Sequence, residues 1–405
     1  MMENLKNITP NVGPLAGLKV IDLTRVLSGP FGTMWMASMG ADIIKIENPK
    51  DPDVTRTHYP QFGQISAYFA TINRNKRCIS LNLKAEEGKQ IFLKLVKDAD
   101  VLVENYRPGV MEKLGLGYDV LSELNPGLVY ASISGYGTFG PYSKYPGYDC
   151  IAQGMSGIMN VTGFPENPPT RIGSSFGDTT AGVSINVGIL AALYCRSITG
   201  RGQKVETSLV ESLITLSAQE NMRYFATGED VTRMGNNYKS WHPYGIFQAG
   251  DGYYVIGSGT QAQFELFAKT IGKPELIDDP RFIDNPHRIE HRQELTDIIF
   301  EWAKTKTVKE VCAILRAGGV PCGPVNSVKD LAEDEHFAGA RGMFPTLHQE
   351  GLGDLRVTKI PLHFSASGLA PMKPAGEIGA FNEEVYGELG ISPEELTVLR
   401  EKGII

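Results

Sequence analysis

Two aspartates in glycine-rich segments are the residues best placed to do chemistry. Asp178 lies in the stretch SSFGDTTAG, directly before an apolar helix, and Asp149 lies in PGYDCIAQGMSG. Free N–H groups and the helix dipole stabilise a carboxylate at a helix N-terminus, so we expect Asp178 to be ionised at neutral pH. The preceding Gly177 would let a ligand approach the backbone. The two acids could act as an acid/base pair or as a nucleophile with its partner.

Simpler roles for these acids stay open, because Asp178 could serve only as an N-cap and Asp149 only as a turn residue. Other chemistries are less well supported by the sequence. The histidines are scattered, and His287 and His291, although four residues apart, stand in a charged stretch, so no metal site is expected. There is no GxSxG segment and no Cys/His pair at a recognisable spacing. Nucleophilic chemistry is therefore left to a carboxylate.

The first glycine-rich turn, LSGPFGTMWMASMG, lacks the GxGxxG pattern of dinucleotide-binding folds. Glu47 ends the next predicted strand, about where a ribose-binding acid would lie, but the glycine spacing argues against a nicotinamide cofactor. A helix N-terminus at this turn could still hold a phosphate.

A parallel sheet covered by helices is predicted for the amino-terminal half. Short apolar runs predict strands at residues 17–23, 41–47, 78–83, 100–106 and 128–134. Between them lie predicted helices at residues 30–40, 85–99 and about 120–124. This alternation is typical of an α/β doubly wound fold with right-handed crossovers. The glycine-, proline- and tyrosine-rich loops from Gly135 to Asp178 follow a strand, where such folds hold their ligands.

The remaining chain predicts a second, smaller domain. An apolar helix from Thr179, a strand and a helix at 210–226 are followed by a polar stretch at 228–245, which is a plausible boundary. A hairpin turning at Asp251–Gly252 and three helices then predict an α+β module. We therefore expect a large domain over 1–229, a small domain over 230–330, and a segment over 331–405 that returns to the large domain.

Composition narrows the function classes. The net charge is −7 and no lysine/arginine cluster is present, which argues against nucleic acid as a partner. Five widely spaced cysteines predict reduced thiols. The amino-terminal stretch has no apolar core of a signal peptide, and the apolar run at 181–194 looks too short to span a membrane. A cytoplasmic protein without a membrane partner is expected.

Several segments together resemble the class III (CaiB/BaiF-type) coenzyme A transferases. They are GLKVIDLTRVLSGPFGTMWMASMGADIIKIENP, NRNKRCISLNLK, ADVLVENYRPGVMEKLGL, GYDCIAQGMSG, GDTTAG, TGRGQKV and GVPCGPVNS, in the order of that family. The resemblance runs from Leu15 to the C-terminus. It implies a Rossmann-like large CoA-binding domain with a parallel sheet, a smaller α+β domain, and an interlinked homodimer. The implied substrates are an acyl-CoA thioester and a small carboxylic acid, with no permanently bound cofactor.

The resemblance also implies roles for individual residues. Asp178 matches the family's nucleophile, which forms a mixed anhydride and then an aspartyl-CoA thioester, and Tyr148 and Asp149 match the active-site wall. Tyr148 could hydrogen-bond a substrate carboxylate, and Asp149 could orient it. The positions that match CoA-binding residues are Leu27, Ser28, Glu47, Asn48, Leu81, Lys84, Asn105, Tyr106, Arg107 and Lys113.

Two departures from relatives separate the possible activities. The 2-methylacyl-CoA racemases of the same superfamily carry histidine where Tyr148 stands, and tyrosine is a much weaker base at neutral pH. Formyl-CoA transferases carry glutamine where Leu27 stands and four glycines where this chain has GNNYKSWHPYG. A transferase is therefore favoured over a racemase, and a non-catalytic CoA-binding protein is the third possibility. The candidate cations for a dicarboxylate substrate are Arg56, Arg74, Arg171 and Lys239.

Overall fold

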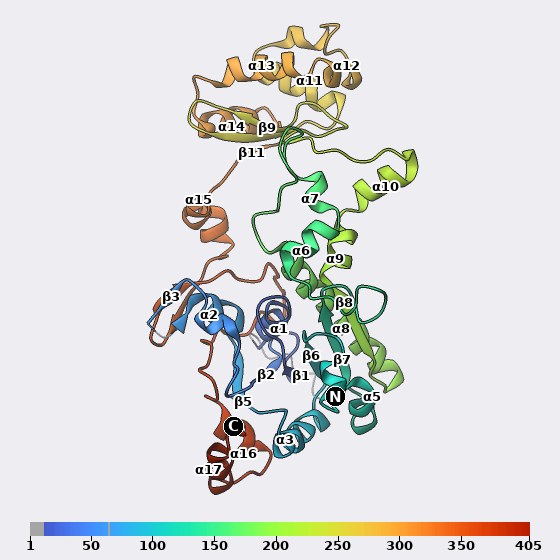
Figure 1. Cartoon of the computed structure of the whole chain (residues 1–405). Helices are drawn as coiled ribbons and strands as arrows, with labels where there is room; N and C mark the ends of the chain where they lie inside the picture. The colour runs from blue at the N-terminus through green and yellow to red at the C-terminus, as the bar shows by residue number, and fades with distance from the viewer. Residues whose placement is uncertain (1–11, 64) are drawn as a thin grey trace. The chain divides into compact units, whose positions relative to one another are not determined.

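The computed structural model describes residues 12–63 and 65–405 (Figure 1). The amino-terminal residues 1–11, in which no signal peptide was expected, lie outside the described residues. The chain forms two compact units. The large unit comprises the described residues as far as Ile158, together with 171–225 and 337–405. The small unit comprises 159–170 and 226–336.

A six-stranded sheet is the centre of the large unit, in the order β5-β2-β1-β6-β7-β8, and every neighbouring pair is parallel. Its strands are β1 (Lys19–Asp22), β2 (Asp42–Glu47), β5 (Lys76–Ser80), β6 (Val101–Glu104), β7 (Val129–Ser134) and β8 (Lys204–Ser208). In the central strand, Val20 pairs with Ile43 of β2 and with Val101 of β6. This sheet confirms the predicted α/β class (Figure 1).

Helices cover both faces of this sheet because its strands are apolar on both sides. Val20 belongs to a core cluster with side chains of α1, α8 and α9, whereas Ile21 belongs to a second cluster with side chains of α3, α5, α16 and α17. The helices on these faces are α1 (Ser28–Ser38), α8 (Phe176–Thr199), α9 (Leu209–Leu216), α3 (Glu86–Lys97), α5 (Tyr118–Leu124), α16 (Asn382–Glu388) and α17 (Pro393–Glu401).

Shorter elements complete the connections of the large unit. They are η2 (Val54–Thr57), β3 (Gln61–Phe62), β4 (Ile65–Ser66), α2 (Ala67–Asn73), α4 (Val110–Lys113), α6 (Asp149–Met155), β12 (Thr346–Gln349) and β13 (Gly353–Arg356), with α7 (Ile158–Val161) and α10 (Ala218–Thr227) reaching the boundaries. The carboxy-terminal segment is bound to the edge strand, since the Tyr386 hydroxyl donates to the Ser80 carbonyl at 2.6 Å and the Asn82 N–H donates to the Ile404 carbonyl at 2.7 Å.

Helices α1 and α8 cross at two glycines. A Cβ atom on Gly32 would lie 2.8 Å from the Gly182 carbonyl oxygen, and one on Gly182 would lie 2.6 Å from the Ser28 carbonyl oxygen. Larger residues therefore do not fit, and close backbone approach requires glycine at both positions. Asn186 also donates to the Gly32 carbonyl at 3.0 Å. The crossing brings the start of α1 against the first turns of α8.

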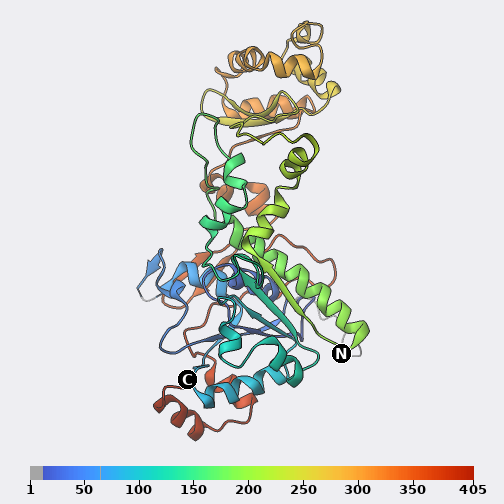
Figure 2. The same ribbon diagram turned by 45° about the vertical axis from the view of Figure 1, so that its right-hand side comes forward.

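Helix α8 contains 24 residues, which makes it longer than the apolar run at 181–194 suggested. By length and composition alone it could cross a membrane, so the expectation that it is too short was wrong. One such helix is weak evidence for a membrane span, because long core helices pass the same test. Ala181, Ile185 and Ile189 are buried in a core cluster that also contains the strand residues Val20 and Val129. Figure 2 shows the long ribbon of α8.

The small unit is built on an antiparallel three-stranded sheet in the order β11-β10-β9. The expected hairpin is present, with the Ala249 N–H donating to the Gly252 carbonyl at 2.8 Å. Its elements are β9 (Tyr244–Gln248), β10 (Tyr253–Gly257), α11 (Gln261–Thr270), η3 (Pro274–Ile277), α12 (Asn285–Glu290), α13 (Arg292–Ala303), α14 (Val308–Ala317), β11 (Cys322–Pro324) and α15 (Val328–Glu333). The π-helix Glu335–Ala340 follows and contains the point in the chain where the small unit ends and the large unit resumes. Phe264, Phe267 and Leu315 are fully buried in its core.

Candidate active site

Two cavities of the large unit lie where the sheet strands end. The first, of about 170 Å³, is lined among others by Glu47, Asn48, Leu81 and Lys84, and is called here the Lys84 cavity. The second, of about 400 Å³, is lined among others by Ser28, Arg107, Tyr148 and Asp178, and is called the Asp178 cavity. Arg25 and Tyr106 line both cavities. An elongated ligand could therefore extend from one to the other past these two side chains.

Asp178 is the third residue of α8, not the residue before it. The N-cap is Ser175, which makes no side-chain capping bond. Asp178 is therefore not an N-cap, and the helix begins earlier than the sequence suggested. Burial and the neighbouring charge of Asp149 raise the pKa of Asp178 to about 7. This corrects the expectation of full ionisation at neutral pH, since burial and a like charge outweigh the helix dipole.

Asp149 fixes the backbone next to Asp178. It begins α6, directly after Tyr148, and it is 8% exposed. One carboxylate oxygen accepts the N–H of Gly177 at 2.8 Å, and the other accepts the side-chain amide of Gln153 at 2.8 Å. Tyr148 is 66% exposed in the wall of the Asp178 cavity.

The residues expected to contact CoA separate into three groups. Glu47, Asn48, Leu81 and Lys84 line the Lys84 cavity. Ser28, Asn105 and Arg107 line the Asp178 cavity, and Tyr106 lines both. Leu27, the N-cap of α1, and Lys113, at the end of α4, are not among the residues that line either cavity.

Two of these residues have their polar atoms engaged by the protein itself. Asn105 accepts the N–H of Arg25 at 2.8 Å and donates to the Arg25 carbonyl at 2.8 Å, so it braces the turn between β1 and α1. Glu47 accepts the side chain of Arg56 at 2.9 and 2.5 Å and the N–H of Asp53 at 3.0 Å. Both therefore shape the cavity walls through internal contacts.

Arg25 is a site residue that was not predicted from the sequence, and Tyr68 is a further residue whose pKa responds to the charge of Asp178. Arg25 forms an ion pair with Asp51 at 3.0 Å and is a wall of both cavities. Its position two residues before Leu27, in a turn already singled out, was a usable signal. Burial, then the charges of Asp178 and Asp53, raise the pKa of Tyr68 to about 12. Tyr68 belongs to α2, a helix that the sequence pattern did not predict.

The cations in the Asp178 cavity are Arg25 and Arg107, not those suggested for a dicarboxylate. Arg56 is paired with Glu47, and Arg74 is buried and donates to the carbonyls of Thr71 and Thr358. Arg171 donates to the Gly173 carbonyl, and Lys239 belongs to the small unit. Among the residues that the structure describes, no three His, Cys, Asp or Glu side chains gather to hold a metal ion.

Comparison with known proteins shows the family of the chain. The profile of CoA-transferase family III matches residues 15–381. An acetyl-CoA:oxalate CoA-transferase of Acetobacter aceti is 44% identical, over 79% of this chain and 82% of its own. A succinyl-CoA:glutarate CoA-transferase of Mus musculus is 36% identical, over 93% of this chain and 86% of its own.

A solved structure, that of a CAIB/BAIF family protein from Brucella suis, superposes with a TM-score of 0.84 at 37% identity. The superposition covers 94% of this chain and 100% of the Brucella suis chain. The family profile, the curated relatives and the parallel sheet agree with one another. The chain belongs to CoA-transferase family III and is a CoA transferase.

Proposed function

We propose that the protein moves CoA from an acyl-CoA thioester to a free carboxylic acid, with Asp178 as the covalent nucleophile. The observation that carries this proposal is the carboxylate of Asp178 in a cavity that shares Arg25 and Tyr106 with the Lys84 cavity. The Lys84 cavity offers a cation for the phosphates of CoA, and the Asp178 cavity offers a nucleophile for its thioester.

The proposed reaction needs four acyl exchanges. An oxygen of Asp178 attacks the thioester carbonyl carbon, the C–S bond breaks, and CoA leaves as a thiolate from a mixed anhydride. The thiolate attacks the aspartyl carbonyl carbon and expels the donor acid as a carboxylate. The acceptor carboxylate then attacks the aspartyl-CoA thioester and expels the thiolate. Finally, the thiolate attacks the acceptor's acyl carbon and frees Asp178. No water or redox partner is consumed, because each step exchanges one thioester or anhydride for another and the activation passes from the donor acyl group to Asp178 and then to the acceptor.

The acceptor is proposed to be a small dicarboxylic acid. The two relatives are named for the dicarboxylates oxalate and glutarate. In this chain, Arg25 and Arg107 provide positive charge in the wall of the Asp178 cavity. Guanidinium groups bind carboxylates in a two-bonded geometry, so Arg107 is proposed to hold the carboxylate that does not react, whereas the Arg25 guanidinium is already paired with Asp51. Tyr148, in the same wall, is proposed to donate a hydrogen bond to the substrate.

A trapping experiment tests the nucleophile. The protein is incubated with acetyl-CoA or succinyl-CoA and hydroxylamine, digested, and examined by mass spectrometry. We expect a hydroxamate on the peptide that contains Asp178, because hydroxylamine cleaves an aspartyl thioester or anhydride. Exchange of the α-proton of a 2-methylacyl-CoA in deuterated water, without any hydroxamate, would contradict the proposal and favour a racemase.

An interlinked homodimer is proposed as the working assembly. Large apolar side chains are exposed along α8, namely Val187, Tyr194 and Ile198, which are 65–70% exposed. They recur at helical spacing and so lie along one face of α8. A second copy of the chain would cover this face, in line with the assembly that the family resemblance implies.

A further inference from the structure

The turn that joins β1 to α1 contains a strained residue. Val26 has a φ of 67°, in the left-handed region. A β-branched residue avoids this region because its side chain crowds the backbone, whereas glycine enters it freely. Arg25, Val26 and Ser28 of this turn line the Asp178 cavity. Something in the surrounding structure must therefore hold Val26 in place.

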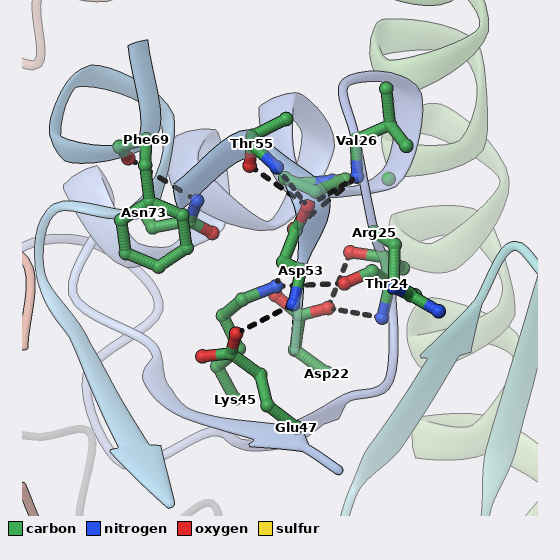
Figure 3. A network of polar contacts seen from close by, with 12 residues as sticks. Asp22, Thr24, Arg25, Val26, Lys45, Glu47, Asp53, Thr55, Phe69 and Asn73 are labelled. Carbon is green, nitrogen blue, oxygen red and sulfur yellow. Dashed lines mark hydrogen bonds and ion pairs between the residues drawn. The ribbon is translucent and has the colours of Figure 1, made fainter. Parts of the chain in front are cut away.

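Asp53 makes the contact that holds it. The N–H of Val26 donates to both carboxylate oxygens of Asp53, at 3.2 Å each (Figure 3). The Asp53 side chain is fully buried and forms an ion pair with Lys45 at 3.3 Å. Thr55 donates to it as well, from its N–H at 3.1 Å and from its hydroxyl at 2.8 Å.

Lys45 holds the other side of the turn. The ammonium group of Lys45 donates to the Thr24 carbonyl at 2.7 Å while it faces Asp53 (Figure 3). Thr24 and Val26 flank Arg25, so the buried pair Lys45–Asp53 holds the turn on both sides. Burial alone would raise the pKa of Asp53, but Lys45 and Thr55 lower it, so the carboxylate is charged.

A charged carboxylate suits this place better than an amide would. Asp53 receives donors from Val26, Thr55 and Lys45, and an ionised carboxylate has lone pairs for all of them. Asparagine has a single acceptor oxygen, and its NH₂ group would face at least one of these donors. An Asp53→Asn change should thus weaken the hold on Val26 while altering side-chain volume little.

We propose that Asp53 is a positioning residue for the transfer reaction: paired with Lys45, it keeps Val26 in the left-handed conformation and so presents the Arg25–Ser28 turn to the thioester beside Asp178. The inference rests on the proposed function. It assigns to Asp53 a role through the turn, without any contact between Asp53 and the reacting atoms.

Glycine at position 26 provides the test. Asp53→Asn is expected to lower kcat/KM for the donor acyl-CoA by about tenfold or more, since small displacements of positioning groups cost rates of this order. Adding Val26→Gly should restore most of the loss, measured against Val26→Gly alone, because glycine needs no restraint to adopt a positive φ. A merely structural loss of the Lys45 pair would not be rescued in this way.

The matched control is Val54→Gly in the Asp53→Asn background. Val54 is also next to Asp53 and in the wall of the Asp178 cavity, but it lies in η2 and has no positive φ. It should give no rescue. Thermal unfolding followed by circular dichroism checks that each variant is folded. If Asp53→Asn does not fold, Thr55→Val is used instead, because it removes one hydrogen bond to Asp53. Thr55→Val should lower kcat/KM by about threefold, and Val26→Gly should again restore it.

The inference is overturned if Asp53→Asn stays within twofold of the wild type, or if Val26→Gly and Val54→Gly act alike. Calorimetric titration with acetyl-CoA separates this failure from a failure of the proposed nucleophile. If the unaltered protein forms no hydroxamate on Asp178, the proposal that Asp178 is the covalent nucleophile fails. Asp53→Asn should still weaken acetyl-CoA binding, and Val26→Gly should still restore it, because Arg25 lines both cavities.

Discussion

Asp149 accepts a hydrogen bond from the backbone N–H of Gly177, the residue directly before Asp178, at 2.8 Å. Burial, and then the negative charge of the same Asp149 carboxylate, raise the pKa of Asp178 to about 7. Asp149 thus holds the backbone next to Asp178 and contributes to the rise of its pKa. The two acids are not equivalent, since Asp178 is among the residues that line the cavity and Asp149 is not.

Replacement of Asp178 should abolish transfer. Asp178→Asn keeps the shape of the side chain but removes the nucleophilic oxygen, so we expect kcat to fall by at least about 10³-fold. A coupled assay with succinyl-CoA or acetyl-CoA and a panel of dicarboxylic acids measures the loss. Asp119→Asn, an exposed change in the first turn of α5, serves as the control and should retain activity. Retention of a tenth of the activity in Asp178→Asn would contradict the assignment.

The pH profile should report the raised pKa. Because the ionised form of Asp178 is the nucleophile and its pKa is about 7, kcat/KM for the donor should rise as the pH increases through about 7 and level off above it. Asp149→Asn removes the like charge and should lower the midpoint by up to about one pH unit, with burial retaining the rest of the shift. An unchanged midpoint in Asp149→Asn would show that Asp149 does not act electrostatically.

Lys84 should contribute to binding more than to chemistry. It is the exposed lysine in the wall of the Lys84 cavity, and Asp178 does not line that cavity. Lys84→Ala should raise KM for the acyl-CoA by about tenfold with little change in kcat, a difference of about 1.4 kcal/mol. The effect should shrink at high salt, because ions screen exposed charges. Lys97→Ala, on the exposed surface of α3, is the control, and an equal effect there would argue against a specific phosphate contact.

The buried ion pair Asp22–Lys76 should contribute strongly to the stability of the large unit. The two side chains are fully buried and 3.0 Å apart. Asp22→Asn leaves the ammonium group of Lys76 without this partner, so we expect a loss of about 3–5 kcal/mol in the free energy of unfolding, measured in urea. Asp354→Asn, which removes an exposed partner of His348, should change it by less than about 0.5 kcal/mol.

Acidification should reveal how much the same ion pair contributes to the free energy of unfolding. Burial alone would raise the pKa of Asp22, but Lys76 and Lys45 lower it to about 2 from an ordinary 3.8. A depressed pKa stabilises the fold above pH 4, and this stability is lost as the pH falls toward 2. The wild type should therefore lose more stability than Asp22→Asn over this range. Equal losses would contradict the assigned direction.

The exposed apolar face of α8, formed by Val187, Tyr194 and Ile198, should control dimer formation. Tyr194→Lys and Ile198→Asp place charges on the apolar face proposed to meet a second copy, and they should convert a dimer into a monomer in analytical ultracentrifugation without detergent. Glu123→Lys, on exposed α5, should leave the dimer intact. A wild type that sediments as a monomer, or that binds vesicles through this face, would contradict the proposed dimer.

The sequence pattern predicted the sheet well because its signals are local. Strands β1, β2, β6 and β7 lie in short runs rich in apolar residues, and the amphipathic period of α3 is visible directly. Strand β5 (Lys76–Ser80) begins two residues before the predicted run at 78–83, because it starts with Lys76 and Arg77. Helix starts were less accurate, since α8 begins at Phe176 and the stretch 210–226 divides into α9 and α10 at Ser217. Caps and breaks of this kind depend on tertiary contacts, such as the bond between Asp149 and Gly177.

Only part of the site could be predicted from the sequence, again because tertiary contacts determine the rest. The family resemblance pointed to Asp178 and Lys84, which line the two cavities. It did not indicate that Asn105 braces the backbone of Arg25, or that Asp53 lies beneath Val26. Those relationships join residues 27 to 80 positions apart in the chain, and no spacing rule links them.

The glycine contact between α1 and α8 has a consequence for enzyme engineering. Any mutation at Gly32 or Gly182 pushes apart the two helices whose starts carry Ser28 and Asp178, so random libraries at those codons will be dominated by inactive clones. Diversity directed at the tyrosine-rich loop 135–148, which supplies Tyr145 and Tyr148 to the cavity wall, leaves that junction untouched. New acceptor acids are best sought there.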